Sequence, residues 1–175
     1  NSSPYESRKQ GDRVDIVTDL SRRNRVYTLY TNQIGGQDEL VFDGGSMLAG
    51  PDGELLGTSP RFEESLLVVD IDAAALEHYR LQHQSFAISQ VELDAIGQPS
   101  TIDITVGSSL KRSKLQDLSI HRLDRLDAVY RALVLGTRDY LKKTGFKKVA
   151  IAVSGGIDSA IVTAIAVDAI GADNI

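Results

Sequence analysis

The chain has 175 residues, of which 42% are hydrophobic and 25% charged, values typical of a globular protein that can bury a sizeable core. Its formal net charge of −5 argues against a general nucleic-acid-binding surface, and no apolar run approaches the roughly 18 residues of a membrane-spanning helix. The absence of cysteine excludes disulfides, thiolate metal ligands and a thiol nucleophile from these residues.

The first residues, NSSPYESRKQ, lack a starting Met and a signal-peptide pattern, so we expect the interior of a longer protein. Residues 9–24 place Val14, Val17 and Leu20 at helical spacing among charges, which predicts a surface helix. Residues 25–32 alternate and are rich in β-branched and aromatic side chains, which predicts a strand.

Further strands with glycine-rich turns are predicted up to residue 72. The glycines that indicate turns around the segment QDELVFD are Gly35, Gly36, Gly44 and Gly45. Residues 46–59 have the pattern of a hairpin, with Pro-Asp-Gly at 51–53 as its turn. The segment ESLLVVDID, residues 64–72, is apolar enough to predict a strand buried on both faces.

Two helices on either side of a linker are predicted next. Residues 73–84 have helical character, and periodicity weakens over 86–118, where the linker is expected. Residues 121–144 predict an amphipathic helix that ends at Gly145. The residues predicted to share its apolar face are Leu123, Leu126, Tyr130, Leu133, Thr137 and Tyr140.

A strand, a tight loop and another helix complete the pattern. KKVAIAV, residues 147–153, predicts a buried strand, and residues 158–170 predict a helix with Ile161, Ile165 and Ile170 towards its apolar side.

The loop between them has residue types suited to a phosphate. Gly155 and Gly156 lack Cβ atoms, so the backbone can turn sharply and present N–H groups beside the helix N-terminus. The hydroxyls of Ser154 and Ser159 can donate to phosphate oxygens. The Asp158 carboxylate would repel a phosphate unless a divalent metal bridged the two, which suggests a magnesium ligand. An ordinary turn with Asp158 capping the helix is the alternative.

The string SGGIDS, residues 154–159, resembles the SGGxDS signature of the PP-loop ATP pyrophosphatases and lacks the Gly-Lys-Ser/Thr ending of a Walker loop. The resemblance implies that ATP is split between its α and β phosphates. An acid or carbonyl oxygen is adenylylated, pyrophosphate leaves, and a nucleophile, often ammonia, displaces AMP. The residues it assigns to ATP and pyrophosphate are Ser154, Gly155, Gly156, Ile157, Asp158 and Ser159, with Mg²⁺ at Asp158.

The segments NSSPYESRK, YTNQIGGQDELVFDGGSMLAGPDGELL and SPRFEESLLVVDID resemble the second half of a nitrilase-type amidase domain. More specifically, they resemble the glutaminase domain of the glutamine-dependent NAD synthetase family, which fuses a glutaminase to a PP-loop synthetase in this order. The resemblance implies that deamido-NAD, ATP, glutamine and water give NAD, AMP, pyrophosphate and glutamate. By position in the family's SP…K segment, Ser3 and Lys9 are expected to hold glutamine, with Lys9 facing its α-carboxylate. A turn followed by a solvated lysine is the alternative.

The resemblance further implies an α/β protein in three parts. Residues 1–85 would be the C-terminal part of a glutaminase (carbon-nitrogen hydrolase) domain, a nitrilase-like α-β-β-α sandwich, and 86–118 the linker. Residues 119–175 would be the N-terminal part of an NAD synthetase domain, the start of an adenine nucleotide α-hydrolase-like parallel sheet. The family's catalytic Cys, Glu and Lys lie upstream of the segment matching Asn1, so no catalytic residue is assigned here and the chain alone is expected to be inactive.

The expected protein is thus part of a cytoplasmic, homo-oligomeric ligase that binds ATP, deamido-NAD and glutamine, without a nucleic-acid or membrane partner. Two alternatives stay open. One is another PP-loop ATP-dependent amidotransferase or a tRNA-modifying relative, although the net negative charge argues against binding of tRNA. The other is a non-catalytic truncated subunit.

Other polar residues carry weaker signals. The nitrilase-like resemblance implies that the stretch with Asp38, Glu39 and Asp43 shapes the pocket and subunit contacts, so these residues are not interpreted as acid–base groups. His78 and His83 are five residues apart and fall on different helix faces, which argues against a metal pair.

Overall fold

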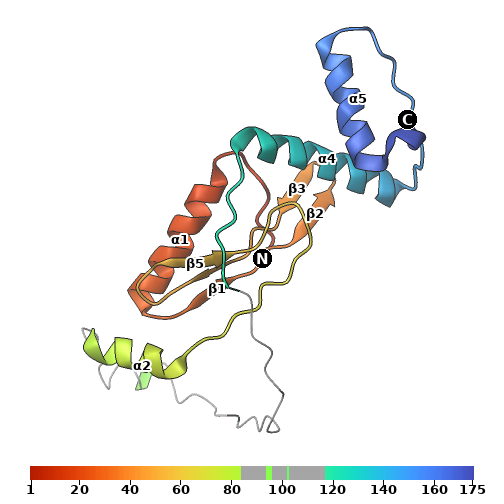
Figure 1. Ribbon diagram of the computed structural model, residues 1–175. Helices are drawn as coiled ribbons and strands as arrows, with labels where there is room; N and C mark the ends of the chain where they lie inside the picture. The colour runs from red at the N-terminus through yellow and green to blue at the C-terminus, as the bar shows by residue number, and fades with distance from the viewer. Residues whose placement is uncertain (84–93, 96–101, 103–116) are drawn as a thin grey trace. The chain divides into compact units, whose positions relative to one another are not determined.

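The computed structural model describes residues 1–83, 94–95, 102 and 117–175 (Figure 1). They form two units, one of Asn1–Val69 with Leu118–Ile175 and one of Asp70–Asp117. Both helices and strands are present, so the chain is a mixed α/β protein. Nearly all of the predicted linker lies outside the described residues. Within those residues, we find no helix with the length and apolarity that crossing a membrane requires.

An antiparallel sheet and one helix open the larger unit. The sheet has the strand order β1-β4-β5, with β4 in the centre and its three residues buried. The helix is α1 (Lys9–Asn24), and the strands are β1 (Thr28–Tyr30), β4 (Met47–Ala49) and β5 (Leu55–Thr58). The predicted helix at 9–24 is confirmed, and the predicted strand at 25–32 is confirmed in its central part.

The buried stripe of α1 differs from the predicted one. Arg13, Val17 and Ser21, spaced by four residues, are buried, whereas Leu20 is exposed. Val17 packs with Met47 of β4 in a small core cluster. Val14 also packs against this cluster, so Leu20 is the member of the predicted set that lies outside. Arg13 and Ser21 are buried although they are polar, because hydrogen-bond partners satisfy them.

The predicted hairpin at 46–59 is confirmed as the pair β4–β5. Its turn is closed by backbone hydrogen bonds from Gly53 N–H to Gly50 C=O (2.9 Å) and from Gly50 N–H to Glu54 C=O (2.8 Å). The Asp52 carboxylate also accepts from the Glu54 amide at 2.9 Å, the local bond that favours Asp in turns.

A separate two-stranded hairpin follows β1. It pairs β2 (Ile34–Gln37) with β3 (Leu40–Asp43), and the chain reverses at Asp38, whose φ is 51°. Gly44 and Gly45 lie between β3 and β4 with φ of 67°, in the left-handed region that favours glycine, and Gly44 forms an isolated bridge with Arg61. The prediction of a turn at Gly35 and Gly36 is wrong, because both lie inside β2 and pair with β3.

Helix α4 (Arg125–Thr144) matches the predicted 121–144 apart from its first turn. Asp124 caps it by accepting from the Leu126 amide at 2.8 Å, and Gly145 ends it with a φ of 82°. The predicted apolar face is wrong: Leu126 is 76% exposed, and the buried residues are Ala128, Ala132 and Leu135. These residues share a core cluster with Ile34 and Val41 of the β2–β3 hairpin, against which α4 packs.

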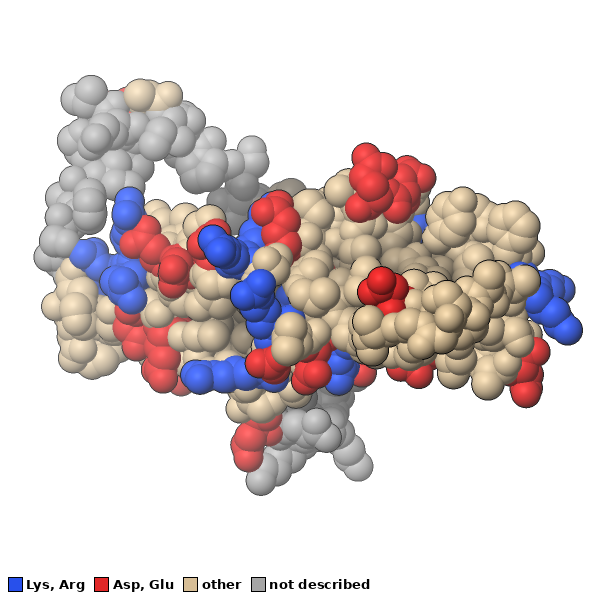
Figure 2. Space-filling model, turned by 90° about the horizontal axis from the view of Figure 1, so that it is seen from above, with Lys and Arg blue, Asp and Glu red and all other residues tan. Residues whose placement is uncertain are grey.

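Helix α5 (Ile157–Ile170) confirms the predicted helix at 158–170 and is followed by a short 3₁₀ helix, η1 (Ala172–Asn174). It packs against α4 and buries Ala166 and Ala169, while Ile161, predicted on the apolar side, is exposed. The end of the molecule that carries α5 (right in Figure 2) is mostly uncharged on the face drawn, whereas acidic and basic side chains mix elsewhere.

One hydrogen bond joins the two helices. The Tyr130 hydroxyl of α4 donates to the Asp168 carboxylate of α5 at 2.7 Å. This bond raises the pKa of Tyr130 above its usual value, because the carboxylate is a partner only for the protonated phenol.

Two predicted strands are wrong. Residues 64–72 form no strand, and Leu66 is 87% exposed. Residues 147–153 also form no ladder, although the Val149 amide donates to the Asn174 carbonyl at 2.9 Å. A strand exists only when a neighbouring backbone supplies its hydrogen bonds. The strand pairs of the described residues are antiparallel, and no parallel sheet is seen among them.

The second unit contains α2 (Ala73–Gln82), which confirms the helix predicted at 73–84. Asp72 caps it by accepting from the Ala75 amide at 3.0 Å. His78 contacts Gln82, and the His83 ring stacks on Tyr79 with centroids 4.2 Å apart.

Candidate functional site

The loop before α5 turns the chain sharply at two glycines. Gly155 has a φ of 84°, in the left-handed region where a side chain would be strained. Gly156 is the N-cap of α5 and has no side chain that could accept from the first amides of the helix. The first turn therefore presents its amides, with the positive end of the helix dipole, to any anion that reaches the loop.

The two predicted hydroxyls of this loop converge. The Oγ atoms of Ser154 and Ser159 lie 3.2 Å apart, and the Ser154 amide donates to Ser159 Oγ at 3.2 Å. Ser159 Oγ also contacts the Gly156 carbonyl at 3.0 Å, so the loop folds back on the first turn of α5. Two hydroxyls and the helix amides thus share one small region.

The remaining loop residues face outward. Asp158 lies in the first turn of α5 and is exposed, and Ile157 is 80% exposed. No group of three or more His, Asp or Glu side chains that could hold a metal ion occurs in the part of the chain that the structure describes. The single Asp158 carboxylate suits Mg²⁺, which is commonly held by one or two carboxylates together with phosphate oxygens.

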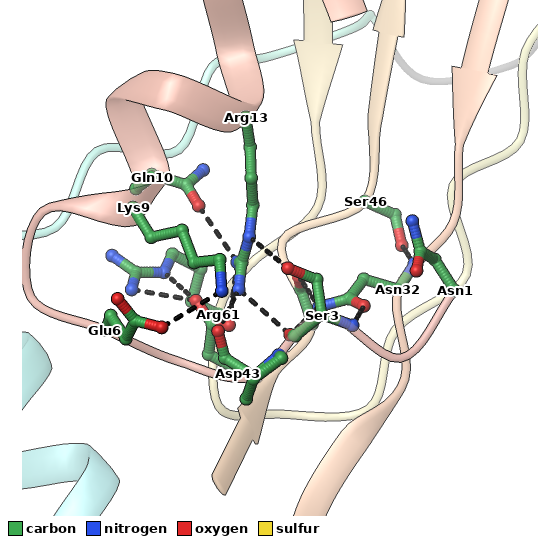
Figure 3. A network of polar contacts seen from close by, with 12 residues as sticks. Asn1, Ser3, Glu6, Lys9, Gln10, Arg13, Asn32, Asp43, Ser46 and Arg61 are labelled. Atoms are coloured by element: carbon green, nitrogen blue, oxygen red, sulfur yellow. Dashed lines mark hydrogen bonds and ion pairs between the residues drawn. The ribbon is translucent and has the colours of Figure 1, made fainter. Parts of the chain in front are cut away.

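A second polar site lies at the start of the chain, around Ser3 (Figure 3). The Ser3 amide donates to Asn32 Oδ1 at 2.9 Å, and the Ser3 carbonyl accepts from Asn32 Nδ2 at 3.1 Å. Asn32 Nδ2 also donates to the Gly44 carbonyl at 3.1 Å, and the Asn32 amide donates to Ser46 Oγ at 3.2 Å. The backbone of Ser3 is therefore fixed on both sides by one buried side chain.

Arg13 of α1 fixes the rest of Ser3. Its Nε donates to Ser3 Oγ at 3.1 Å, and its Nη2 donates to the carbonyls of Ser3 (2.9 Å) and Pro4 (2.7 Å). Since Arg13 supplies the donor, the Ser3 hydroxyl keeps its own proton for another acceptor. Ser3 is thus a pre-positioned donor, in line with a polar ligand at this site.

Asp43, at the end of β3, holds Arg13 in place. Arg13 Nη1 lies 2.8 Å from one oxygen of Asp43, and Arg61 Nε and Nη2 each lie 2.8 Å from the other. The Asp43 side chain is 0% exposed. Arg61 also lies over the rings of Tyr5 and Phe62, at 5.4 Å and 5.1 Å from their centroids.

Sequence reasoning missed this Arg13–Asp43–Arg61 network. It interpreted Asp43 as pocket-shaping, and it named neither arginine. The available signal was Arg13, which lies four residues before Val17 and so falls on the buried side of α1. An arginine on a buried stripe requires a carboxylate partner, because an unpaired buried charge is costly.

The second predicted residue of this site, Lys9, is near the start of α1. Its Nζ forms an ion pair with Glu6 at 3.0 Å, and about a third (33%) of its side chain is exposed. The Glu6 side chain is 68% exposed, and an ion pair with a partner in water contributes little to holding Lys9 in place. Ser3 and Lys9 are both partly buried, but Ser3 is held by Arg13 and Asn32, whereas Lys9 is paired with the exposed Glu6 (Figure 3).

Two protein families match separate parts of the chain. Residues 6–81 match the carbon-nitrogen hydrolase family, and residues 129–175 match the NAD synthase family. The first range contains the Arg13–Asp43–Arg61 network, and the second contains the loop and α5.

Comparisons that span the whole of this chain match proteins of one kind. The chain is 38% identical over 175 residues to the glutamine-dependent NAD(+) synthetase of Acinetobacter baylyi and 32% identical to that of Aquifex aeolicus. All of the chain is covered in both, but only 26% and 30% of those proteins. The structure of glutamine-dependent NAD+ synthetase from Acinetobacter baumannii, in complex with ADP, matches with a TM-score of 0.71 at 33% identity. That match covers 99% of this chain and 26% of the solved one.

Proposed function

We propose, from the premise that this chain is homologous along its whole length to glutamine-dependent NAD(+) synthetase, that it is the segment joining the two catalytic halves of such a ligase. The full-length protein would convert deamido-NAD, ATP, glutamine and water to NAD, AMP, pyrophosphate and glutamate. The chain spans about a quarter of the relatives that it matches (26% in Acinetobacter baylyi), so the activity belongs to the full-length protein.

We propose residues 1–85 as the C-terminal part of the glutaminase domain, 86–118 as the linker and 119–175 as the N-terminal part of the synthetase domain. The two family matches, at 6–81 and 129–175, support this division. In the full-length fold, we expect the first part to join an α-β-β-α sandwich. Residues 147–153, which form no strand here, would become a strand of a parallel sheet once neighbouring strands supply hydrogen bonds.

The observation that carries the proposal is the loop at 154–159. Its hydroxyls lie 3.2 Å apart beside the open N-terminus of α5, an arrangement suited to the phosphates of ATP. The relative solved with ADP supports an adenine nucleotide as ligand. Within this chain, Ser154 and Ser159 would donate to phosphate oxygens, and the amides after Gly156 would stabilise the departing pyrophosphate. Mg²⁺ bound by Asp158 would supply charge neutralisation between carboxylate and phosphates.

The amino-terminal site would hold glutamine. Ser3 offers a fixed hydroxyl, and Lys9 offers an ammonium that needs only to leave its exposed partner Glu6. We propose that Lys9 binds the α-carboxylate and Ser3 another polar group of glutamine. A homo-oligomeric state and a cytoplasmic location remain predictions that rest on the resemblance.

Identification of the acid that the full-length protein adenylylates tests the function. We expect pyrophosphate release to require deamido-NAD, and NAD to form with either glutamine or ammonium. Release that depends on a different acid would identify another amidotransferase. No release under any condition would support a non-catalytic subunit.

Lys9→Ala in the full-length protein should raise the KM for glutamine about 10- to 100-fold with less change in kcat. The lost contact is a charge-assisted hydrogen bond of roughly 1.5 to 3 kcal/mol, which is similar in the ground and transition states. Steady-state glutaminase kinetics measure the change. Synthesis from ammonium, which bypasses the glutamine site, is the internal control. An unchanged KM for glutamine would mean that Lys9 is a solvated surface residue and does not bind glutamine.

Gly155→Ala should weaken ATP binding about 5- to 30-fold, because a left-handed conformation costs a residue with a Cβ roughly 1 to 2 kcal/mol. The effect is conformational rather than a clash, since a Cβ added at Gly155 meets no atom within 4 Å. Calorimetric ATP binding measures it, and glutamine hydrolysis should persist. Gly11→Ala is the matched control, because Gly11 is also open but lies in helix α1. Equal ATP affinity in both variants would contradict the assignment.

A further inference from the structure

The two family regions meet at a direct contact. Helix α4, most of which lies in the NAD synthase match, packs against the β2–β3 hairpin of the carbon-nitrogen hydrolase match. Ala132 and Leu135 of α4 share a core cluster with Ile34 and Val41 of the hairpin. We call this contact the seam.

Glycines bring the two backbones unusually close at the seam. A Cβ added at Gly36 of β2 would lie 3.1 Å from Gly136 Cα and 3.2 Å from Asp139 Cβ. A Cβ added at Gly136 would lie 3.2 Å from Val41 Cγ2. These distances are tighter than ordinary van der Waals contacts, so a side chain at either glycine would require its neighbour to shift by a few tenths of an ångström. At Gly36 that neighbour is the backbone of α4, which makes glycine the residue best suited to this spacing.

Two side chains of α4 bind the backbone of the hairpin across the seam. Asp139 Oδ2 accepts from the Gly36 amide at 2.8 Å, and Lys143 Nζ donates to the Gly36 carbonyl at 2.5 Å and to Gln37 Oε1 at 2.9 Å. Asp139 and Lys143 are four residues apart and so lie on the same face of the helix. They satisfy both peptide groups of one strand residue, as a neighbouring strand would.

Helix α4 is connected in turn to the loop-bearing helix. It packs against α5, and Tyr130 of α4 donates to Asp168 of α5. The loop at 154–156 immediately precedes α5. Hairpin, α4, α5 and loop therefore form one continuous series of contacts.

We propose that the seam sets the position of the pyrophosphate loop relative to the glutaminase region, with Asp139 and Lys143 as positioning residues for glutamine-driven synthesis. The proposal rests on the proposed function. Each half has chemistry of its own: glutamine is hydrolysed in one and the adenylate forms in the other. Only the transfer of ammonia between them requires a fixed relative position, because ammonia that escapes to water is diluted and protonated.

The test uses the full-length protein with Asp139→Ala and Lys143→Met, and it measures glutamate released per NAD formed. We expect this ratio to rise about 2- to 30-fold, the range for mutations between coupled sites. Synthesis from saturating ammonium and the glutaminase rate should each stay within about 2-fold. Asp139→Asn keeps an acceptor oxygen for the Gly36 amide and should restore most of the coupling.

Lys142→Met is the matched control, since it removes the same charge from the adjacent, exposed position of α4. Gly36→Ala tests the seam without changing a charge, and it covers the case in which Asp139→Ala fails to fold. The proposal would be overturned if folded Lys143→Met and Gly36→Ala released the same amount of glutamate per NAD as the wild type. It would also be overturned if glutaminase activity, synthesis from ammonium and synthesis from glutamine all fell to the same extent. A wild-type protein that makes no NAD from ammonium would instead refute the proposed function.

Discussion

Asp158→Asn in the full-length protein is expected to slow pyrophosphate release by about 100-fold or more. The stabilisation supplied by a bound divalent ion is commonly several kcal/mol, and each 1.36 kcal/mol changes a rate about tenfold. Asn is close in shape to Asp but lacks the charge that balances Mg²⁺ beside phosphates. Rates should be measured over a range of Mg²⁺ concentrations with deamido-NAD and ATP saturating. The mutant should need a higher Mg²⁺ concentration for half-maximal activity, and its maximal rate of pyrophosphate release should be lower.

Asp173→Asn is the control for this loss of charge, because Asp173 lies in η1, after α5, and is exposed. We expect it to leave pyrophosphate release nearly unchanged. If Asp158→Asn matched the wild type at saturating Mg²⁺, Asp158 would be a helix-cap or surface residue and not a metal ligand.

Asp43→Asn is expected to destabilise the fold by about 3 to 5 kcal/mol, the range found when one member of a buried ion pair is removed. Asp43 is fully buried, and it neutralises the guanidinium groups of Arg13 and Arg61, which are themselves 6% and 8% exposed. The mutation leaves two buried positive charges facing each other without a carboxylate. Urea denaturation of the chain, followed by far-UV circular dichroism, measures the free energy of unfolding.

Asp38→Asn provides the comparison for stability. Asp38 lies in the exposed turn of the same hairpin with φ 51°, a conformation that Asn also adopts readily. Its effect should be within about 0.5 kcal/mol of zero. A loss below 1 kcal/mol for Asp43→Asn would mean that water or rearrangement of the arginines replaces the carboxylate.

The contacts of Asp43 also explain why the amino-terminal site depends on distant residues. Arg13 is oriented by Asp43 and in turn holds Ser3 Oγ and the Ser3 carbonyl. Loss of the carboxylate should therefore loosen Ser3 as well as the fold. A polar ligand at Ser3 would then bind more weakly even in the fraction of molecules that stays folded.

Local patterns in the sequence were sufficient for the helices and for one hairpin. Residues 9–24, 73–84 and 158–170 became α1, α2 and α5, within two residues at either end. The PDG turn formed between β4 and β5, since Pro and Asp favour that turn wherever it occurs. The two glycines before α5, and the contact between Ser154 of the loop and Ser159 of the first helical turn, also involve residues close in sequence.

Patterns that depend on a distant partner were predicted less well. Residues 64–72 and 147–153 are as apolar as buried strands, but no neighbouring strand accompanies them among the described residues. The apolar stripe of α4 was assigned to Leu126 and Tyr140, which are exposed. Hydrophobic spacing shows that a face could be buried, and the partner decides which face is.

The residue types of the loop at 154–159 and the family resemblance can be read from the amino-acid sequence alone, because both depend on residue types at short spacing. Only the tertiary structure placed Gly36 inside a strand, against Gly136, and brought Asp43 between Arg13 and Arg61. Gly36 and Gly136 are 100 residues apart in the chain, and Arg13 and Asp43 are 30 apart. Close backbone approach and buried charge pairing are properties of two surfaces in contact, so no local pattern in the chain specifies them.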